Sequence, residues 1–158
     1  MVQGDEPLVF PEQIDKSIKA LEKKKFSVSN LMKKLETVEE INNPNNVKVV
    51  FNNFGKALYM SRSAIPSEKK FSEEIDYFRQ LGLIAFSTES LLKFIELKPS
   101  RLEIIESVDM NRFLENGVSI KMIETLLEVD AIDVPSDLVR VESKMKKDIL
   151  FKKYFNEN

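Results

Sequence analysis

The sequence predicts an α/β domain organised around a mixed β-sheet. Segments with apolar residues at helical spacing alternate with short runs rich in Val, Ile and Phe, an arrangement typical of helices packed on a sheet. Two adjacent strand-like runs, residues 47–51 and 57–61, are separated by Asn52-Asn53-Phe54-Gly55, which favours a hairpin and therefore some antiparallel pairing. The chain has 158 residues, of which 42% are hydrophobic, so one domain can bury a core.

Local signals predict the other elements in chain order. Before the hairpin we expect a helix from Phe10-Pro11, a strand at residues 26–31 and a short helix or turn at 36–40. After it we expect a loop at 66–74, a strand at 77–86, helices from Ser87 and Ser100, a strand at 120–125 and a last helix from Pro135. Pro11 suits a first helical turn, because a backbone N–H at that position has no partner within the helix and proline lacks this N–H. Ile14, Ile18 and Leu21 recur at helical spacing and are expected to face the core.

The helix that begins after Ser100 has the clearest boundaries. Ser100-x-x-Glu103 is a capping box, and Gly117 suits the left-handed residue that ends a helix. One continuous helix between them would put Glu106, Asp109 and Arg112 on one face, because they are three residues apart. That face could be the wall of a polar pocket or a solvated ion-pair surface.

Composition limits the available chemistry and partners. The chain has no cysteine and no histidine, which excludes disulfides, thiolate chemistry, the commonest general base and the usual zinc ligands. Its net charge of −2 gives no general attraction to nucleic acid, although the lysine-rich end leaves that as a weaker alternative. No apolar run approaches the roughly 18 residues of a membrane span. We therefore expect no nucleic acid, no membrane span and a cytoplasmic location.

Two acidic junctions are the main candidates for a site. Residues 2–7, Val-Gln-Gly-Asp-Glu-Pro, are interpreted as the end of a buried strand that enters a tight turn, and Asp133 precedes the helix from Pro135. Carboxylates such as Asp5 and Asp133 could together hold a hard cation. Alternatively, Asp5 could bond its own backbone in the turn, and Asp133 could complement a helix N-terminus.

Together with three further motifs, these junctions resemble the CMP-sugar synthetase family. The motifs are Asn43-Pro44-Asn45, Val47-Lys48-Val49-Val50 and Ala57-Leu58-Tyr59-Met60-Ser61-Arg62-Ser63-Ala64-Ile65-Pro66. The resemblance is greatest to the cytidylyltransferases of 3-deoxy-manno-octulosonate (Kdo). It covers residues 1–144 as a C-terminal portion of such a domain and leaves 145–158 as a lysine-rich extension. It implies a nucleotide-diphospho-sugar transferase-like (Rossmann-like) mixed sheet with an inserted hairpin.

The resemblance also implies a reaction and a set of residues. CMP would pass from CTP to an ulosonic acid such as Kdo, with Asp5 and Asp133 as catalytic residues that hold Mg²⁺. The implied substrate-binding residues are Gln3, Arg62, Gln80, Glu106 and Asp109. Gln3 could instead satisfy nearby backbone, Arg62 could be a solvated strand end, and Lys48 could protect an edge strand.

The sugar side departs from the usual Kdo pattern. Kdo enzymes usually have histidine at Gln80, tyrosine at Ile84 and a Glu-Gln pair at Asp109-Met110. Because these changes remove hydrogen-bonding groups, a related ulosonic acid is an alternative substrate.

A further departure concerns the triphosphate. The family opens with a basic loop, roughly Arg-x-x-Ser-x-Arg-Leu-Pro-Gly-Lys, and this chain has no such loop; its one Gly-Lys pair, Gly55-Lys56, falls in the hairpin turn. We therefore expect an N-terminally truncated chain that is incomplete alone. Apolar surface would be exposed at Val2 and strand 77–86, so a homodimer through residues 47–61 or a companion N-terminal polypeptide is expected. The alternative is a non-catalytic remnant that acts as a dimerisation or interaction module.

Overall fold

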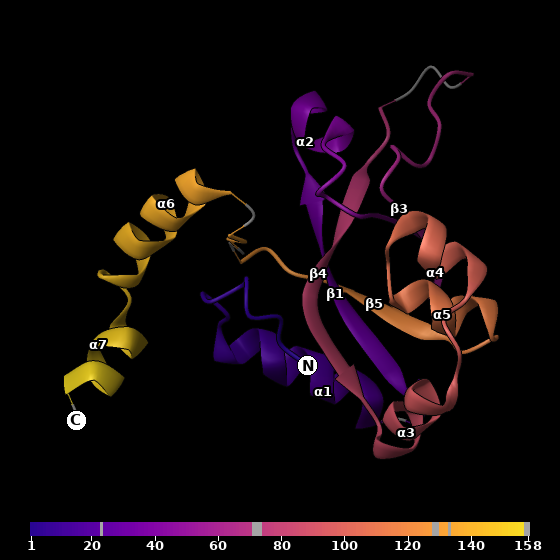
Figure 1. Ribbon diagram of the computed structural model, residues 1–158, viewed down its shortest axis with the longest axis horizontal. Coiled ribbons are helices and arrows are strands. Elements are labelled where there is room, and N and C mark those ends of the chain that lie inside the picture. The colour runs from indigo at the N-terminus through magenta and orange to yellow at the C-terminus, as the bar shows by residue number, and fades with distance from the viewer. Residues whose placement is uncertain (23, 71–73, 128–129, 133, 157–158) are drawn as a thin grey trace.

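The computed structural model describes all residues except 23, 71–73, 128–129, 133 and 157–158 (Figure 1). The strands are β1 (Val28–Leu35), β2 (Lys48–Phe51), β3 (Ala57–Ser61), β4 (Tyr77–Phe86) and β5 (Ile120–Glu124). The helices are α1 (Pro11–Glu22), α2 (Val38–Asn42), α3 (Thr88–Glu96), α4 (Arg101–Glu106), α5 (Met110–Glu115), α6 (Pro135–Met145) and α7 (Ile149–Asn156). The predicted α/β class is confirmed.

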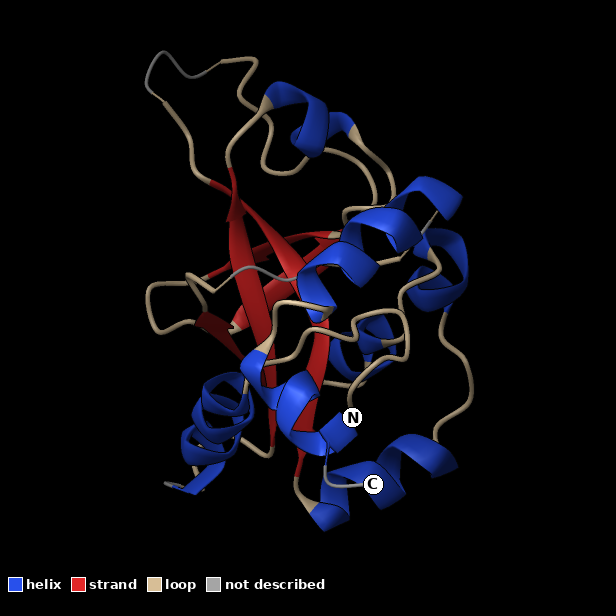
Figure 2. Ribbon diagram, turned by 90° about the vertical axis from the view of Figure 1, so that its left-hand side faces the viewer, coloured by secondary structure: helices blue, strands red, loops and turns tan. Residues whose placement is uncertain are grey.

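The strands form one mixed sheet in the order β3-β2-β4-β1-β5. β1 runs antiparallel to β4 and parallel to β5, and β2 and β3 form the predicted hairpin. The hairpin turn contains Gly55 at φ 70°, which favours glycine. Its tip reaches the far edge of the sheet, where Met122 donates its N–H to the Gly55 carbonyl at 2.8 Å. The sheet is therefore strongly curled (Figure 2).

Helices cover both faces of this sheet. α4 and α5 lie on one side, and α1 lies on the other against β1 and β4 (Figure 1). Phe113 of α5 is fully buried in the larger core, where its ring lies 5.0 Å from Phe94 and 6.1 Å from Phe86 between centroids. A smaller core of Leu31, Leu81 and Leu83 lies elsewhere in the sheet.

The prediction for the inner face of α1 is wrong. Ile14 and Ile18 are 39% and 52% exposed, whereas Gln13 and Ser17 are buried. Ser17 allows a close approach to β1, where the Ser29 hydroxyl donates to its carbonyl at 2.7 Å. Gln13 accepts from the Phe10 N–H at 3.0 Å. Satisfied polar contacts therefore replace the expected apolar stripe.

The single helix expected after Ser100 is also wrong. Glu103 accepts the Ser100 N–H at 2.9 Å, which is half of the predicted capping box, but the Ser100 hydroxyl has no hydrogen-bond partner among the described residues. Ser107 adopts a left-handed conformation at φ 53° and separates α4 from α5. Arg62 binds the two carbonyls at this break, donating from Nε to Glu106 at 2.8 Å and from Nη2 to Ser107 at 3.1 Å. Glu106, Asp109 and Arg112 consequently share no helical face.

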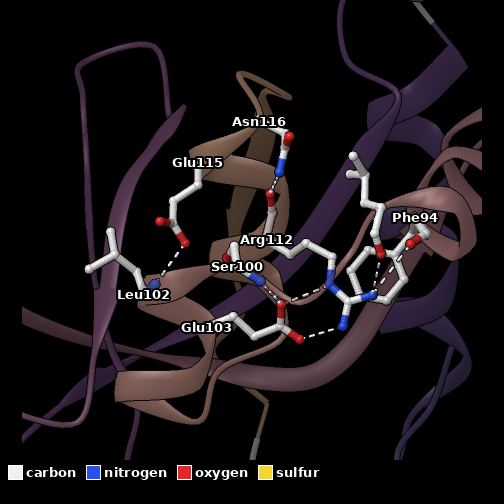
Figure 3. A network of polar contacts seen from close by, with 8 residues as sticks. Phe94, Ser100, Leu102, Glu103, Arg112, Glu115 and Asn116 are labelled. Atoms are coloured by element: carbon white, nitrogen blue, oxygen red, sulfur yellow. Dashed lines mark hydrogen bonds and ion pairs between the residues drawn. The ribbon is translucent and has the colours of Figure 1, made fainter.

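Arg112 instead joins α3, α4 and α5 (Figure 3). Its Nε donates to Glu103 at 2.7 Å, its Nη2 pairs with the same carboxylate, and its Nη1 donates to the Leu97 carbonyl at 3.2 Å. The guanidinium also lies 4.2 Å from the Phe94 ring centroid. The hydrogen bond from Arg112 lowers the pKa of Glu103 below its usual value, although burial opposes it. This buried pair fixes the arrangement of three short helices.

Three expectations, about residues 2–7, β4 and the helix from Pro135, need correction. Residues 2–7 are not the end of a buried strand, because Val2 forms only an isolated bridge to Leu83 and is 49% exposed. The exposure expected at Val2 itself is present. Strand β4 is not an exposed edge, because β1 pairs along one side while β2 and residues 1–3 pair along the other. The helix from Pro135 is followed by α7, so it is not the last. Among the described residues, no helix is long and apolar enough to span a membrane.

Candidate functional site

A bulge in β4 prepares the position of the first acidic junction. Two steps along β1, from Asn30 to Met32, correspond to four along β4, from Ile84 to Gln80. The fully buried Asn30 side chain donates to the carbonyls of Leu81 at 2.7 Å and Leu83 at 3.1 Å. The bulge therefore leaves the N–H and carbonyl of the intervening Gly82 for another segment.

That segment is the acidic turn, residues 3–6. Gln3 donates its N–H to the Gly82 carbonyl at 3.1 Å, and Gly82 donates its N–H to Oε1 of the buried Glu6 at 2.8 Å. A Cβ at Gly82 would lie 2.4 Å from Oε1 and 2.8 Å from Cβ of Gln3. Only glycine lets the acidic turn approach β4 this closely.

The acidic turn forms one wall of a polar cleft of ≈ 330 Å³. Its described lining comes from the chain start and the acidic turn, the loop before β2, the end of β3, β4, the junction of α4 with α5 and the segment before α6. The residues are Met1, Gln3, Asp5, Glu6, Asn45, Asn46, Val47, Arg62, Arg79, Gln80, Gly82, Ile84, Ser107, Val108, Asp109, Met110 and Ala131. Five of the predicted site residues meet here: Gln3, Asp5, Arg62, Gln80 and Asp109. Glu106 is absent from this lining.

Asp5 is available to a ligand in this cleft. Its side chain is exposed, and it makes no hydrogen bond or ion pair with another described residue. Its carbonyl accepts the N–H of Ile132 at 2.9 Å, which brings the chain before α6 beside the acidic turn. Asp133 itself lies outside the described residues, so the convergence of Asp5 and Asp133 stays a prediction.

The described donors fit Mg²⁺ in a limited way. Among the described residues, no group of three or more acidic, histidine or cysteine side chains is placed so that it could hold a metal ion. Mg²⁺ commonly uses only one or two carboxylates and completes its coordination with water and substrate oxygens. The exposed carboxylate of Asp5 fits that requirement.

Two cations hold the asparagine turn, residues 43–46, against the cleft. Lys48 donates to the Asn43 carbonyl at 2.9 Å, and Arg62 donates from Nη1 to the Pro44 carbonyl at 2.9 Å. Lys48 is fully buried on an inner strand, so its interpretation as an edge-strand charge is wrong. Burial, followed by the nearby charge of Arg62, lowers the pKa of Lys48.

The carboxylate of Glu106 is hydrogen-bonded to other parts of the protein and does not line the cleft. Its carboxylate accepts from the Tyr59 hydroxyl at 2.8 Å, the Ser61 hydroxyl at 2.9 Å and the Arg62 N–H at 2.9 Å. Burial raises the pKa of Glu106, but these hydrogen bonds outweigh it and the pKa is lowered. Burial and then the bond to Glu106 raise the pKa of Tyr59 to about 12. Glu106 thus holds the hairpin to α4.

The remaining cleft residues differ in how many of their polar groups already have hydrogen-bond partners. Arg62 uses three of its five N–H donors on backbone carbonyls, so donors remain for a ligand. Oε1 of Gln80 is buried and has no hydrogen-bond partner among the described residues. Asp109 is exposed at the start of α5. Sequence reasoning missed Asn46 and Arg79, which are joined by a 3.0 Å hydrogen bond; the Asn-rich breaker was the available signal for Asn46.

This fold and cleft place the chain in a known family. It matches the model of the cytidylyltransferase family over residues 1–123 and belongs to that family. It is 38% identical over 146 residues to the 3-deoxy-manno-octulosonate cytidylyltransferase of Cytophaga hutchinsonii, with 89% of this chain and 58% of the relative covered. The corresponding protein of Thermodesulfovibrio yellowstonii is 40% identical over 142 residues, with 87% of this chain and 56% of the relative covered.

A solved structure gives the same result in three dimensions. The CMP:2-keto-3-deoxy-manno-octonic acid synthetase complexed with CTP superimposes with a TM-score of 0.84 at 28% identity, covering 92% of this chain and 60% of that one. The family resemblance is therefore confirmed. The chain spans between 56% and 60% of the length of these three proteins.

Proposed function

We propose that this chain takes part in the transfer of CMP from CTP to an ulosonic acid such as Kdo. The observation that carries the proposal is the cleft, which gathers Asp5, Arg62 and Gln80 from distant parts of the chain. The names of the relatives support the reaction, and the CTP in the related structure supports the nucleotide. A cytoplasmic location belongs to the same proposal.

The charged side chains of the cleft, Arg62 and Asp5, suggest which part of each substrate they would bind. The remaining N–H donors of Arg62 suit the carboxylate of a sugar acid, because a guanidinium matches a carboxylate in shape and charge. Asn45, Gln3, Gln80 and Asp109 line the cleft and could meet sugar hydroxyls. Glu106 would support this binding indirectly by fixing the Arg62 backbone.

The acidic residues would act on the phosphates of CTP through a bound cation. Asp5, together with Asp133 if the two converge, would hold Mg²⁺. When bound, Mg²⁺ neutralises charge that develops on phosphate oxygens during transfer. This chain has no histidine, so none of its own side chains is an imidazole base. The roles proposed for its residues are binding, orientation and charge stabilisation.

The proposal can be tested by separating sugar binding from turnover. We expect the purified chain to bind Kdo or a related ulosonic acid saturably by titration calorimetry, and Arg62→Gln to weaken this binding by on the order of 10-fold. We expect no pyrophosphate release from CTP by the chain alone, because it lacks the basic loop for the triphosphate. Arg101→Gln, an exposed arginine on α4, is the matched control.

Each readout has an outcome that contradicts the proposal. Turnover by the isolated chain would refute its incompleteness. If neither Kdo nor any related ulosonic acid binds, the site assignment fails and the non-catalytic interaction module becomes the better interpretation.

We also propose that the chain self-associates through the hairpin region. β3 is an outer strand of the sheet, and Leu58 on it is 57% exposed. On the adjoining α4, Ile104 is 68% exposed and Ile105 is 63% exposed. Sedimentation at micromolar concentration should show a dimer, and Leu58→Lys should shift it towards monomer. Ile149→Lys on the distant α7, 82% exposed, should not. A monodisperse wild-type monomer would contradict this prediction, whereas a species that needs a companion polypeptide would support the alternative partner.

A further inference from the structure

We propose that Glu6 is a positioning residue of the cleft, which fixes the direction in which Asp5 presents its carboxylate. The proposal rests on the proposed function, in which Asp5 holds the metal. Glu6 and Asp5 are adjacent acids with opposite environments. Glu6 is 6% exposed and directed to the backbone of β4, whereas Asp5 is exposed and lines the cleft.

The anchoring point for Glu6 is unusually well defined. Gly82 is held in its bulge because Asn30 satisfies the carbonyls of Leu81 and Leu83 on either side. Its N–H is consequently directed to one acceptor, Oε1 of Glu6, at 2.8 Å. Loss of this acceptor would leave the N–H of Gly82 buried without a partner, whereas a neutral oxygen at the same place would still accept it.

Asp5 lies between two fixed points. Gln3 and Glu6 both bond to Gly82 and close the acidic turn on that side. On the other side, the Asp5 carbonyl accepts the Ile132 N–H at 2.9 Å. Without the Glu6 carboxylate bond, the backbone bonds from Glu6 to Gln3 at 3.2 Å and from Ile132 to Asp5 would still close the turn, but its link to β4 through the Glu6 side chain would be lost. The Asp5 carboxylate would then sample several directions and bind a cation less well.

Two conservative variants separate reach from charge. Glu6→Gln keeps the length of the side chain and an acceptor oxygen, but loses the charge. Glu6→Asp keeps the charge, but is one methylene shorter and does not reach Gly82. If Glu6 acts by position, Glu6→Gln should resemble the wild type and Glu6→Asp should not.

The experiment uses the full chain and Mn²⁺ as a paramagnetic probe. The Mn²⁺ concentration that half-broadens the amide signals of the acidic turn is read from ¹H–¹⁵N spectra. We expect it to stay within about twofold for Glu6→Gln and to rise on the order of 10-fold for Glu6→Asp, as when the residue that orients a metal ligand is lost. The Gly82 amide should exchange faster with solvent in Glu6→Asp, and thermal unfolding confirms that each variant is folded. Glu12→Asp, an exposed acid in α1, is the matched control.

The outcomes distinguish this proposal from the proposed function. If Mn²⁺ broadens the acidic turn equally in wild type and Glu6→Asp, the positioning role is refuted and the metal site stands. If Glu6→Gln binds Mn²⁺ more weakly than the wild type and Glu6→Asp binds it equally well, Glu6 acts through its charge and the proposal is wrong. If the wild type shows no selective broadening near Asp5, the metal assignment fails, and the positioning role with it. Should Glu6→Asp not fold, Gly82→Ala, which displaces Gln3 from the same bulge, must give the same loss.

Discussion

Replacing Arg112 by methionine is expected to lower the free energy of unfolding by about 3–5 kcal/mol, the usual cost of removing one partner of a buried ion pair. Glu103 would remain buried at 7% exposure with its charge uncompensated. The Leu97 carbonyl would also lose a donor, and the Phe94 ring would lose the cation above it. Because this residue joins three short helices, few other contacts can replace it.

Chemical denaturation of both proteins measures this effect, with Arg101→Met on the exposed face of α4 as the control. The pKa of Glu103 is lowered in the folded protein, so its ionised form stabilises the fold above its unfolded pKa of about 4.3. That stabilisation is lost as the pH falls through the lower folded pKa. The difference between wild type and Arg112→Met should therefore shrink in acid. A loss below about 1 kcal/mol at neutral pH, typical of a surface pair, would contradict the prediction.

Replacing Asp5 by asparagine is expected to slow CMP transfer on the order of 10²–10³-fold, which corresponds to about 3–4 kcal/mol of transition-state stabilisation. The substitution keeps the shape of the side chain but removes the charge that would hold the cation. Because the side chain of Asp5 is exposed and has no hydrogen-bond or ion-pair partner among the described residues, the fold should be unaffected.

Transfer is measured by pyrophosphate release, with this chain supplied with the triphosphate-binding portion of a family member. The Michaelis constant for the sugar acid should change little, because Arg62 and the other lining side chains remain. Asp15→Asn, an exposed aspartate on α1, is the control. An Asp5→Asn protein with wild-type turnover would remove Asp5 from the catalytic role.

The local elements of the fold could be predicted because their signals lie within a few residues. The strand Tyr77–Phe86 has the expected bounds, Ser87 caps α3, α4 begins directly after Ser100, and the hairpin turns at Gly55. The prediction for the inner face of α1 depended on a partner elsewhere in the chain, and it was wrong. Ile14 and Ile18 have the spacing of a core stripe, yet a close helix–sheet approach selected Ser17 instead.

For the candidate site too, sequence motifs predicted which residues gather but not how each side chain is used. Sequence motifs identified Gln3, Asp5, Arg62, Gln80 and Asp109, and the structure brings them to one cleft. The motifs did not show that Glu106 is directed to the hairpin, because its partners Tyr59 and Ser61 are more than forty positions away.

The sequence by itself determined the family, the chemistry that is possible without histidine or cysteine, and which acids and amides are available. Only the tertiary structure decided which of these side chains are free to bind and which are used to hold the cleft. Glu6 and Asp5 are equal acids in the sequence, and they differ because a bulge between β1 and β4 offers one N–H to one of them. A bulge is a property of the register between two strands. No pattern within either strand specifies it.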